Sequence, residues 1–96
     1  MENSFCIKLT IKTASGHECF GEFFLGQNRK IAENIFQQLK GDRDVDDHNI
    51  LQLDLMESHN GLPVNIKMMT CDLDELEENC RIITKEMFRV FNLEQP

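Results

Sequence analysis

The sequence contains no tryptophan and no tyrosine, and no apolar run in it approaches the length of a membrane span. Without those two aromatic types the chain has little to line a catalytic cleft. Its first residues also show no apolar run after a basic segment, so no secretory leader is indicated. We therefore expect a cytoplasmic protein that does not associate with membranes and has no catalytic residues.

Basic residues are also scarce. Ten lysines and arginines stand against 17 aspartates and glutamates, which gives a formal net charge of -7. That charge opposes attraction to nucleic-acid phosphates, so we expect no nucleic-acid partner.

Length and composition set the size of the fold. The chain has 96 residues, 41% of them hydrophobic and 28% charged, which predicts one domain over residues 1–96. A core of this size leaves a modest stability margin, and self-association often adds to it. A homo-oligomer, most simply a dimer, is the expected state.

The four cysteines lack metal-site and redox spacing. Cys6, Cys19, Cys71 and Cys80 contain no Cys-x-x-Cys pair. In a cytoplasmic protein they are expected to be reduced thiols, and we expect no metal and no cofactor.

The first part of the chain predicts a hairpin followed by a helix. Apolar residues alternate over residues 5–11, the turn falls at residues 14–16, and residues 19–25 form a second extended segment. Helical spacing then extends over residues 28–40, from an N-cap at Asn28 to a stop at Gly41.

The second part repeats this rhythm. Residues 51–55 and 64–68 alternate around a turn at His59-Asn60-Gly61. Asp72 and Glu75 then form a capping box for a helix. An apolar stripe along that helix is expected to pack on the sheet. Its members are Leu73, Leu76, Cys80, Ile83, Met87, Val90, Phe88 and Phe91.

The order strand-strand-helix-strand-strand-helix predicts an α+β fold. We expect a two-layer sandwich in which a four-stranded, mostly antiparallel sheet carries both helices on one face. Alternation then divides the strand residues between two faces. The residues expected to face the helices are Phe5, Ile7, Leu9, Ile11, Leu51, Leu53, Leu55, Val64, Ile66 and Met68.

The second face of the predicted sheet is where binding is expected. Lysines, Gln52 and Asp54 mix there with apolar residues, a composition typical of a partner or dimer surface. The sequence therefore predicts an interaction domain that homodimerises, or binds another protein, through this face. The predicted interface residues are Phe20, Phe24, Ile50, Met56 and Met69.

Two other functions stay open. The first is a regulatory domain that binds a small anionic ligand at the start of the first helix, where Asn28, Arg29 and Lys30 combine free backbone amides with two cations. The second is an enzyme of unknown reaction, for which Cys19 near His17 is the one candidate pair. The acidic segment 42–48 begins like a calcium loop but lacks its glycine and its final glutamate, so it is expected to be a solvated loop.

Overall fold

The computed structural model describes residues 3–43 and 50–93. Within these ranges the chain forms a four-stranded sheet, two α-helices and a final π-helical turn. The elements are β1 (Ser4–Thr13), β2 (Gly16–Gly26), α1 (Arg29–Gln37), β3 (Leu51–His59), β4 (Leu62–Cys71), α2 (Leu73–Phe88) and η1 (Arg89–Leu93). The expected α+β class and the antiparallel four-stranded sheet are confirmed.

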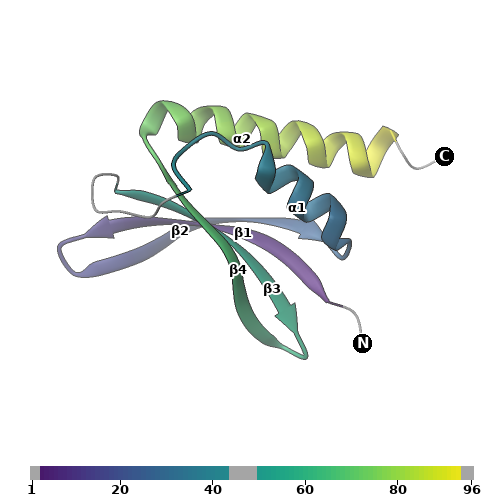
Figure 1. Ribbon diagram of the computed structural model, residues 1–96, viewed down its shortest axis with the longest axis horizontal. Coiled ribbons are helices and arrows are strands. Elements are labelled where there is room, and N and C mark those ends of the chain that lie inside the picture. The colour runs from purple at the N-terminus through teal and green to yellow at the C-terminus, as the bar shows by residue number, and fades with distance from the viewer. Residues whose placement is uncertain (1–2, 44–49, 94–96) are drawn as a thin grey trace.

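The sheet is built from two hairpins joined through their first strands. The strand order is β2-β1-β3-β4, and every neighbouring pair is antiparallel. Asn60 and Gly61, with φ of 54° and 81°, form the turn predicted between β3 and β4. Figure 1 shows the hairpins pointing in different directions, because the sheet twists strongly along its width.

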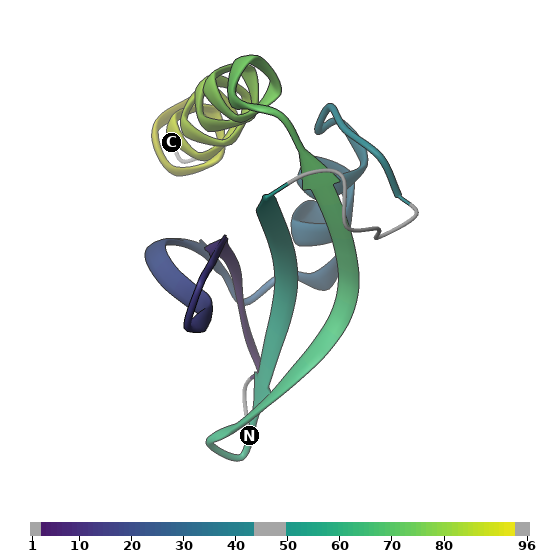
Figure 2. The same ribbon diagram turned by 90° about the vertical axis from the view of Figure 1, so that its left-hand side faces the viewer.

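One core joins the sheet to both helices. Ile7 and Leu53 are fully buried, and they share the core with Phe36 of α1 and Ile83 of α2. The expected burial of residues 5, 7, 9, 51, 53 and 55 is confirmed. The two-layer description holds only in part. Figure 2 shows α1 against the strands, whereas α2 crosses above one end of the sheet.

Both helices begin at their predicted caps. The Asn28 side chain accepts a bond from the backbone N–H of Ile31, and the reciprocal capping box between Asp72 and Glu75 is complete. The first helix ends earlier than the predicted residue 40. After Gln37 the last turns tighten, with Leu39 N–H bonded to Phe36 O at 3.2 Å.

The prediction for the faces of the last strand is wrong in part. Between Leu55 and Met56 the β3–β4 register shifts, so Ile66 is an extra residue on β4. The shift reverses the alternation beyond it. Met69 is therefore fully buried in the core, and Met68, which was expected there, is 45% exposed.

The helical stripe predicted to lie on the sheet is also only partly buried. Ile83 has no exposed surface and Leu76 is half-buried, as expected. Leu73 and Phe88, by contrast, are 72% and 63% exposed. The inner side of α2 uses residues 79 and 83, which leaves Leu73 and Phe88 about a quarter-turn or more away from the core.

Candidate interaction surface

The face of the sheet away from the helices is called the open face here. Neighbouring residues in an antiparallel register point to the same side, so the pairing defines its rows. Its two central rows are Phe24, Cys6, Met56 and Asn65, and then Glu22, Lys8, Asp54 and Met68. Apolar and charged side chains are therefore interleaved across all four strands.

The twist of the sheet makes a hollow in the open face. The hollow has a volume of about 340 Å³, and both hairpins contribute to its walls. Phe24, Met56 and Pro63 supply apolar surface, while Lys8 and Glu22 supply charge. This lining suits an apolar side chain of a partner whose polar groups meet the charged residues at the edge.

Cys6 lies in this hollow as a protonated thiol. Burial, followed by a hydrogen bond with Glu22, raises the pKa of the thiol to about 11. The thiol is therefore protonated at neutral pH, where a reactive cysteine would need to be a thiolate. At neutral pH Cys6 therefore contributes a small neutral side chain to the wall of the hollow.

The open face is balanced in charge although the chain is acidic. Its strand positions include Lys8 and Lys12 and also Glu22 and Asp54, so the formal charges cancel. The Asp54 carboxylate also accepts a hydrogen bond of 2.8 Å from the Gln52 amide. The net charge of -7 is thus carried by other parts of the molecule.

The predicted interface residues are not all on the open face. Phe24, 62% exposed, and the half-buried Met56 lie there. Phe20 and Ile50 are 50% and 54% exposed, near the opposite end of the sheet, and Phe20 occupies an irregularity in the β1–β2 pairing. Met69 is in the core instead. Met68 is the exposed methionine that the sequence reasoning missed, because the β-bulge reverses the alternation.

At the start of α1, the predicted anion site is already occupied by side chains of the protein. Arg29 pairs with Glu57 at 2.5 Å and with Glu33 at 3.4 Å, and its guanidinium lies 5.6 Å from the Phe5 ring centroid. Lys30 is exposed. An anion at this site would have to compete with two carboxylates for Arg29.

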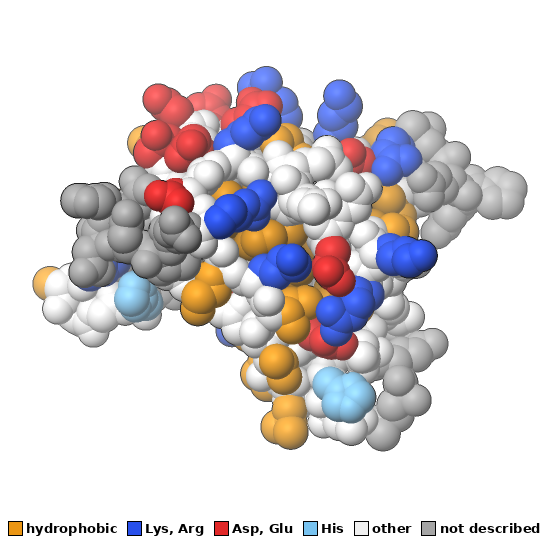
Figure 3. Space-filling model, viewed as in Figure 1, with side chains coloured by type: hydrophobic (Ala, Val, Ile, Leu, Met, Phe, Trp, Pro, Cys, Tyr) orange, Lys and Arg blue, Asp and Glu red, His pale blue; other side chains and the backbone are white. Residues whose placement is uncertain are grey.

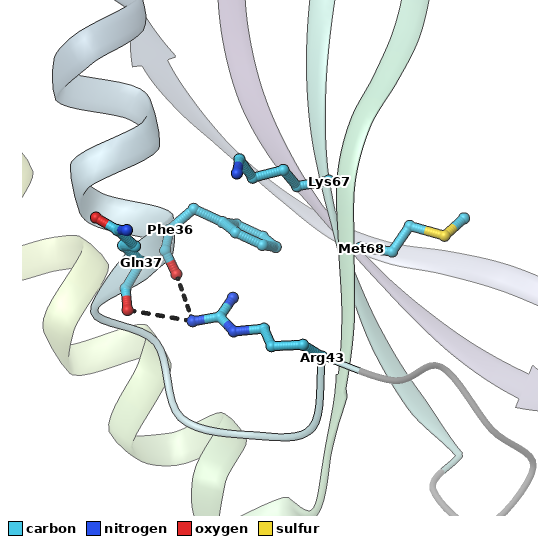
Figure 4. Close-up of a pocket in the computed structure, with 5 residues that line it drawn as sticks. All are labelled: Phe36, Gln37, Arg43, Lys67 and Met68. Atoms are coloured by element: carbon cyan, nitrogen blue, oxygen red, sulfur yellow. Dashed lines mark hydrogen bonds between the residues drawn. The ribbon is translucent and has the colours of Figure 1, made fainter.

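A second pocket, of about 390 Å³, lies between the end of α1 and β4. Figure 4 shows Arg43 pointing across it toward α1, where the guanidinium donates to the Phe36 and Gln37 carbonyls at 3.2 and 3.1 Å. The same nitrogen also reaches Leu39 O, and the guanidinium stacks 5.3 Å from the Phe36 ring centroid. Arg43 therefore caps the C-terminus of the helix.

Asn79 completes the attachment of α1, and sequence reasoning missed it. It is fully buried, accepts from the Lys40 N–H at 2.6 Å and donates to the Lys40 carbonyl at 2.8 Å. The sequence feature that could have identified Asn79 is its polar side chain at a core position of the helix, between Leu76 and Ile83. A buried amide in such a stripe requires partners of this kind.

All four cysteines are free thiols. Within residues 3–43 and 50–93, no three histidine, cysteine, aspartate or glutamate side chains gather closely enough to hold a metal ion. The acidic segment 42–48 lies mostly outside the described residues. Its first residue, Asp42, forms an isolated antiparallel bridge with Thr70.

Comparisons of the chain with protein-family models, curated protein sequences and solved structures found no match. None of the described helices combines the length and the apolar composition needed to cross a bilayer. The surfaces of the molecule are therefore the basis for inferring its function.

Proposed function

We propose that this protein is a small cytoplasmic interaction domain that homodimerises through the open face of its sheet. The observation that carries this proposal is a charge-balanced face with a large exposed aromatic residue, on a chain with a net charge of -7. Such a face is suited to a neutral, partly apolar partner surface, and a second copy of the same face has those properties.

The shape of a twisted sheet favours this partner. A regularly twisted sheet is a saddle, hollow along one diagonal and raised along the other. A half-turn about a line along the central strands maps a saddle onto itself. The hollow of one copy therefore receives the ridge of the other, as in the aligned packing of two sheets.

The residue pattern matches the same half-turn. The centre of the sheet lies between β1 and β3, and across it Lys8 pairs with Asp54 and Cys6 pairs with Met56. A half-turn about a line that runs between β1 and β3, parallel to both strands, places Lys8 of each copy over Asp54 of the other. Each lysine then lies over an acid that is 9% exposed in the single chain, and the apolar Cys6 and Met56 meet each other.

The test is the mass of the purified protein in solution across a dilution series, with Phe24→Glu and Leu62→Glu as matched variants. Both residues are strongly exposed, at 62% and 69%, but Leu62 lies at the tip of the β3–β4 hairpin. We expect the wild type to reach at least twice 11.2 kDa. Phe24→Glu should weaken dimerisation about tenfold or more, and Leu62→Glu should leave it unchanged.

Two results would contradict the proposal. A wild-type monomer at every concentration would remove the dimer, and equal weakening by both variants would show that the open face is not the interface. Circular dichroism on each variant separates a lost interface from a lost fold. A charge-swapped double variant gives a second check. Lys8→Asp and Asp54→Lys should each weaken the dimer, and both changes together in one chain should restore it.

The other functions considered for the chain remain predictions. An anionic ligand at Asn28, Arg29 and Lys30 gains no support from the geometry, because Arg29 already has two carboxylate partners. An enzymatic role for Cys19 and His17 likewise has no supporting observation. Four free thiols agree with the proposed cytoplasmic location.

A further inference from the structure

A second surface with exposed apolar residues runs along α2, beside the side that faces the core, although its Cys80 packs partly against the core and its Phe91 lies near Gly26. Positions 73, 77, 80, 84, 88 and 91 follow one another at spacings of three and four, so they form one stripe. We call it the outer stripe. Leu73, Phe88 and Phe91 in it are 72%, 63% and 46% exposed. Leu73 and Phe88 are the first and last residues of α2 and Phe91 lies in η1, so the exposed apolar side chains are at the two ends of the stripe.

A shallow groove of about 510 Å³ follows the centre of the outer stripe. Cys80, Thr84 and Phe88 line it, and Arg81 and Lys85 border it. Burial raises the pKa of the Cys80 thiol, so this residue contributes to the groove as a small neutral group. The groove is therefore apolar at its centre and basic along one edge.

The charges of α2 are divided along its length. Its first half contains Asp74, Glu75, Glu77 and Glu78, while the second half contains Arg81, Lys85 and Glu86 and is weakly basic, and Arg89 follows the helix. In Figure 3, acidic side chains gather over the N-terminal end of α2 and basic ones lie further along it. The helix dipole accounts for charges in the terminal turns. It does not account for Arg81, in the middle of the helix.

We propose that the outer stripe binds the same stripe of a second copy, with the two α2 helices antiparallel. A half-turn near Cys80 brings Leu73 of each copy to Phe88 of the other. It also places Glu77 of each copy beside the partner's basic edge at Arg81 and Lys85. The acidic half of each helix thereby meets the basic half of its partner, and the helix dipoles oppose each other favourably.

The contact that Arg81 makes within its own chain is weak. Arg81 is 3.8 Å from Glu78 of the same helix, and both side chains are well exposed at 70% and 46%. Exposed pairs of this kind contribute little to stability. The 16 residues of α2 span about 24 Å, which gives a small interface and a contact that depends on its charge pattern.

This contact is separate from the proposed sheet dimer. The helices lie on the other side of the sheet from the open face (Figure 1). A chain with two self-complementary surfaces forms assemblies larger than a dimer. The two contacts can therefore be removed one at a time.

The experiment uses the full chain carrying Phe24→Glu, which weakens the sheet contact, at concentrations too low for that weakened contact to form. An acidic variant adds Arg81→Glu and Lys85→Glu. A basic variant adds Asp74→Lys and Glu77→Lys. Sedimentation velocity is measured for the Phe24→Glu parent, for each variant alone and for their equimolar mixture, and circular dichroism confirms that each is folded.

We expect the parent to self-associate through α2 and each variant alone to do so at least about tenfold more weakly, because like charges then oppose each other along the whole stripe. The mixture should form a heterodimer at least as readily as the parent forms a homodimer. A parent that stays monomeric overturns the proposal, as does a mixture that behaves as the sum of its parts. Unimpaired association of either variant alone also overturns it.

Discussion

Replacement of Asn79 should reveal how firmly α1 is held to α2. The Asn79 amide is fully buried and makes both an acceptor and a donor bond with the backbone of Lys40, at 2.6 and 2.8 Å. These two bonds lie where α1 has already ended, so no helical carbonyl or N–H substitutes for the amide. The side chain therefore fixes the chain as it leaves the helix.

Asn79→Leu keeps the branched shape of the side chain but removes both bonds. Each buried group left without a partner costs about 1–3 kcal/mol. Lys40 is an exposed residue, so water can reach part of its backbone, and the lower end of that range applies. The expected loss is therefore about 2–3 kcal/mol, a large part of the roughly 5–15 kcal/mol that stabilises a chain of this size.

Asn79→Asp tests the donor bond alone. One carboxyl oxygen still accepts from the Lys40 N–H, but the other faces the Lys40 carbonyl and can bond to it only when protonated. The folded pKa of this aspartate should therefore rise above its unfolded value of about 3.9. The folded state then binds the proton more tightly, so the variant approaches wild-type stability below about pH 4 and loses stability as the pH rises.

The assay is urea denaturation followed by circular dichroism at several values between about pH 4 and pH 7.5, with the wild type measured in parallel. Asn34→Asp makes the same chemical change at an exposed position of α1 and should cost less than about 0.5 kcal/mol. The Asn79→Asp deficit relative to the wild type should grow by at least about 2 kcal/mol over this range. A deficit that is independent of pH, or equal to that of Asn34→Asp, would refute the reasoning.

Three further predictions concern stability. Gly41→Ala should cost at least about 3 kcal/mol in urea denaturation, because its φ is 148° and a β-carbon would clash with the backbone of β4, whereas Gly16→Ala at φ 120° has open space and should cost less. Burial raises the pKa of the Cys71 thiol from 9.0 to about 11, so the folded state favours the protonated thiol. The free energy of unfolding should therefore be unaffected by this thiol below about pH 9 and decrease toward pH 11. In urea denaturation, Cys71→Ala should make that decrease smaller. Arg29→Met should lower the thermal midpoint by several degrees because it leaves the buried Glu57 carboxylate without its cation, with only the hydrogen bond from Asn3. A near-zero shift equal to that of the exposed Lys30→Met would contradict this role.

Local patterns in the sequence were enough to predict which segments form strands and helices. Alternation over residues 5–11 and 51–55 predicted the buried faces of β1 and β3, and these faces are observed. The caps at Asn28 and Asp72 and the turn at Asn60-Gly61 were also predictable, because each depends on hydrogen bonds or dihedral angles within a few residues. Local patterns of this kind are present in the sequence without knowledge of the partners.

Which side chains make up each surface depends on contacts between elements that are far apart in the sequence. The β-bulge opposite Leu55 depends on the pairing of two strands, so sequence alternation could not show that Met69 is buried and Met68 exposed. The early end of α1 depends on Arg43 and Asn79, which arrive from outside the helix. The exposed stripe on α2 likewise follows from where the helix crosses the sheet, because periodicity gives an apolar side but not the surface it meets.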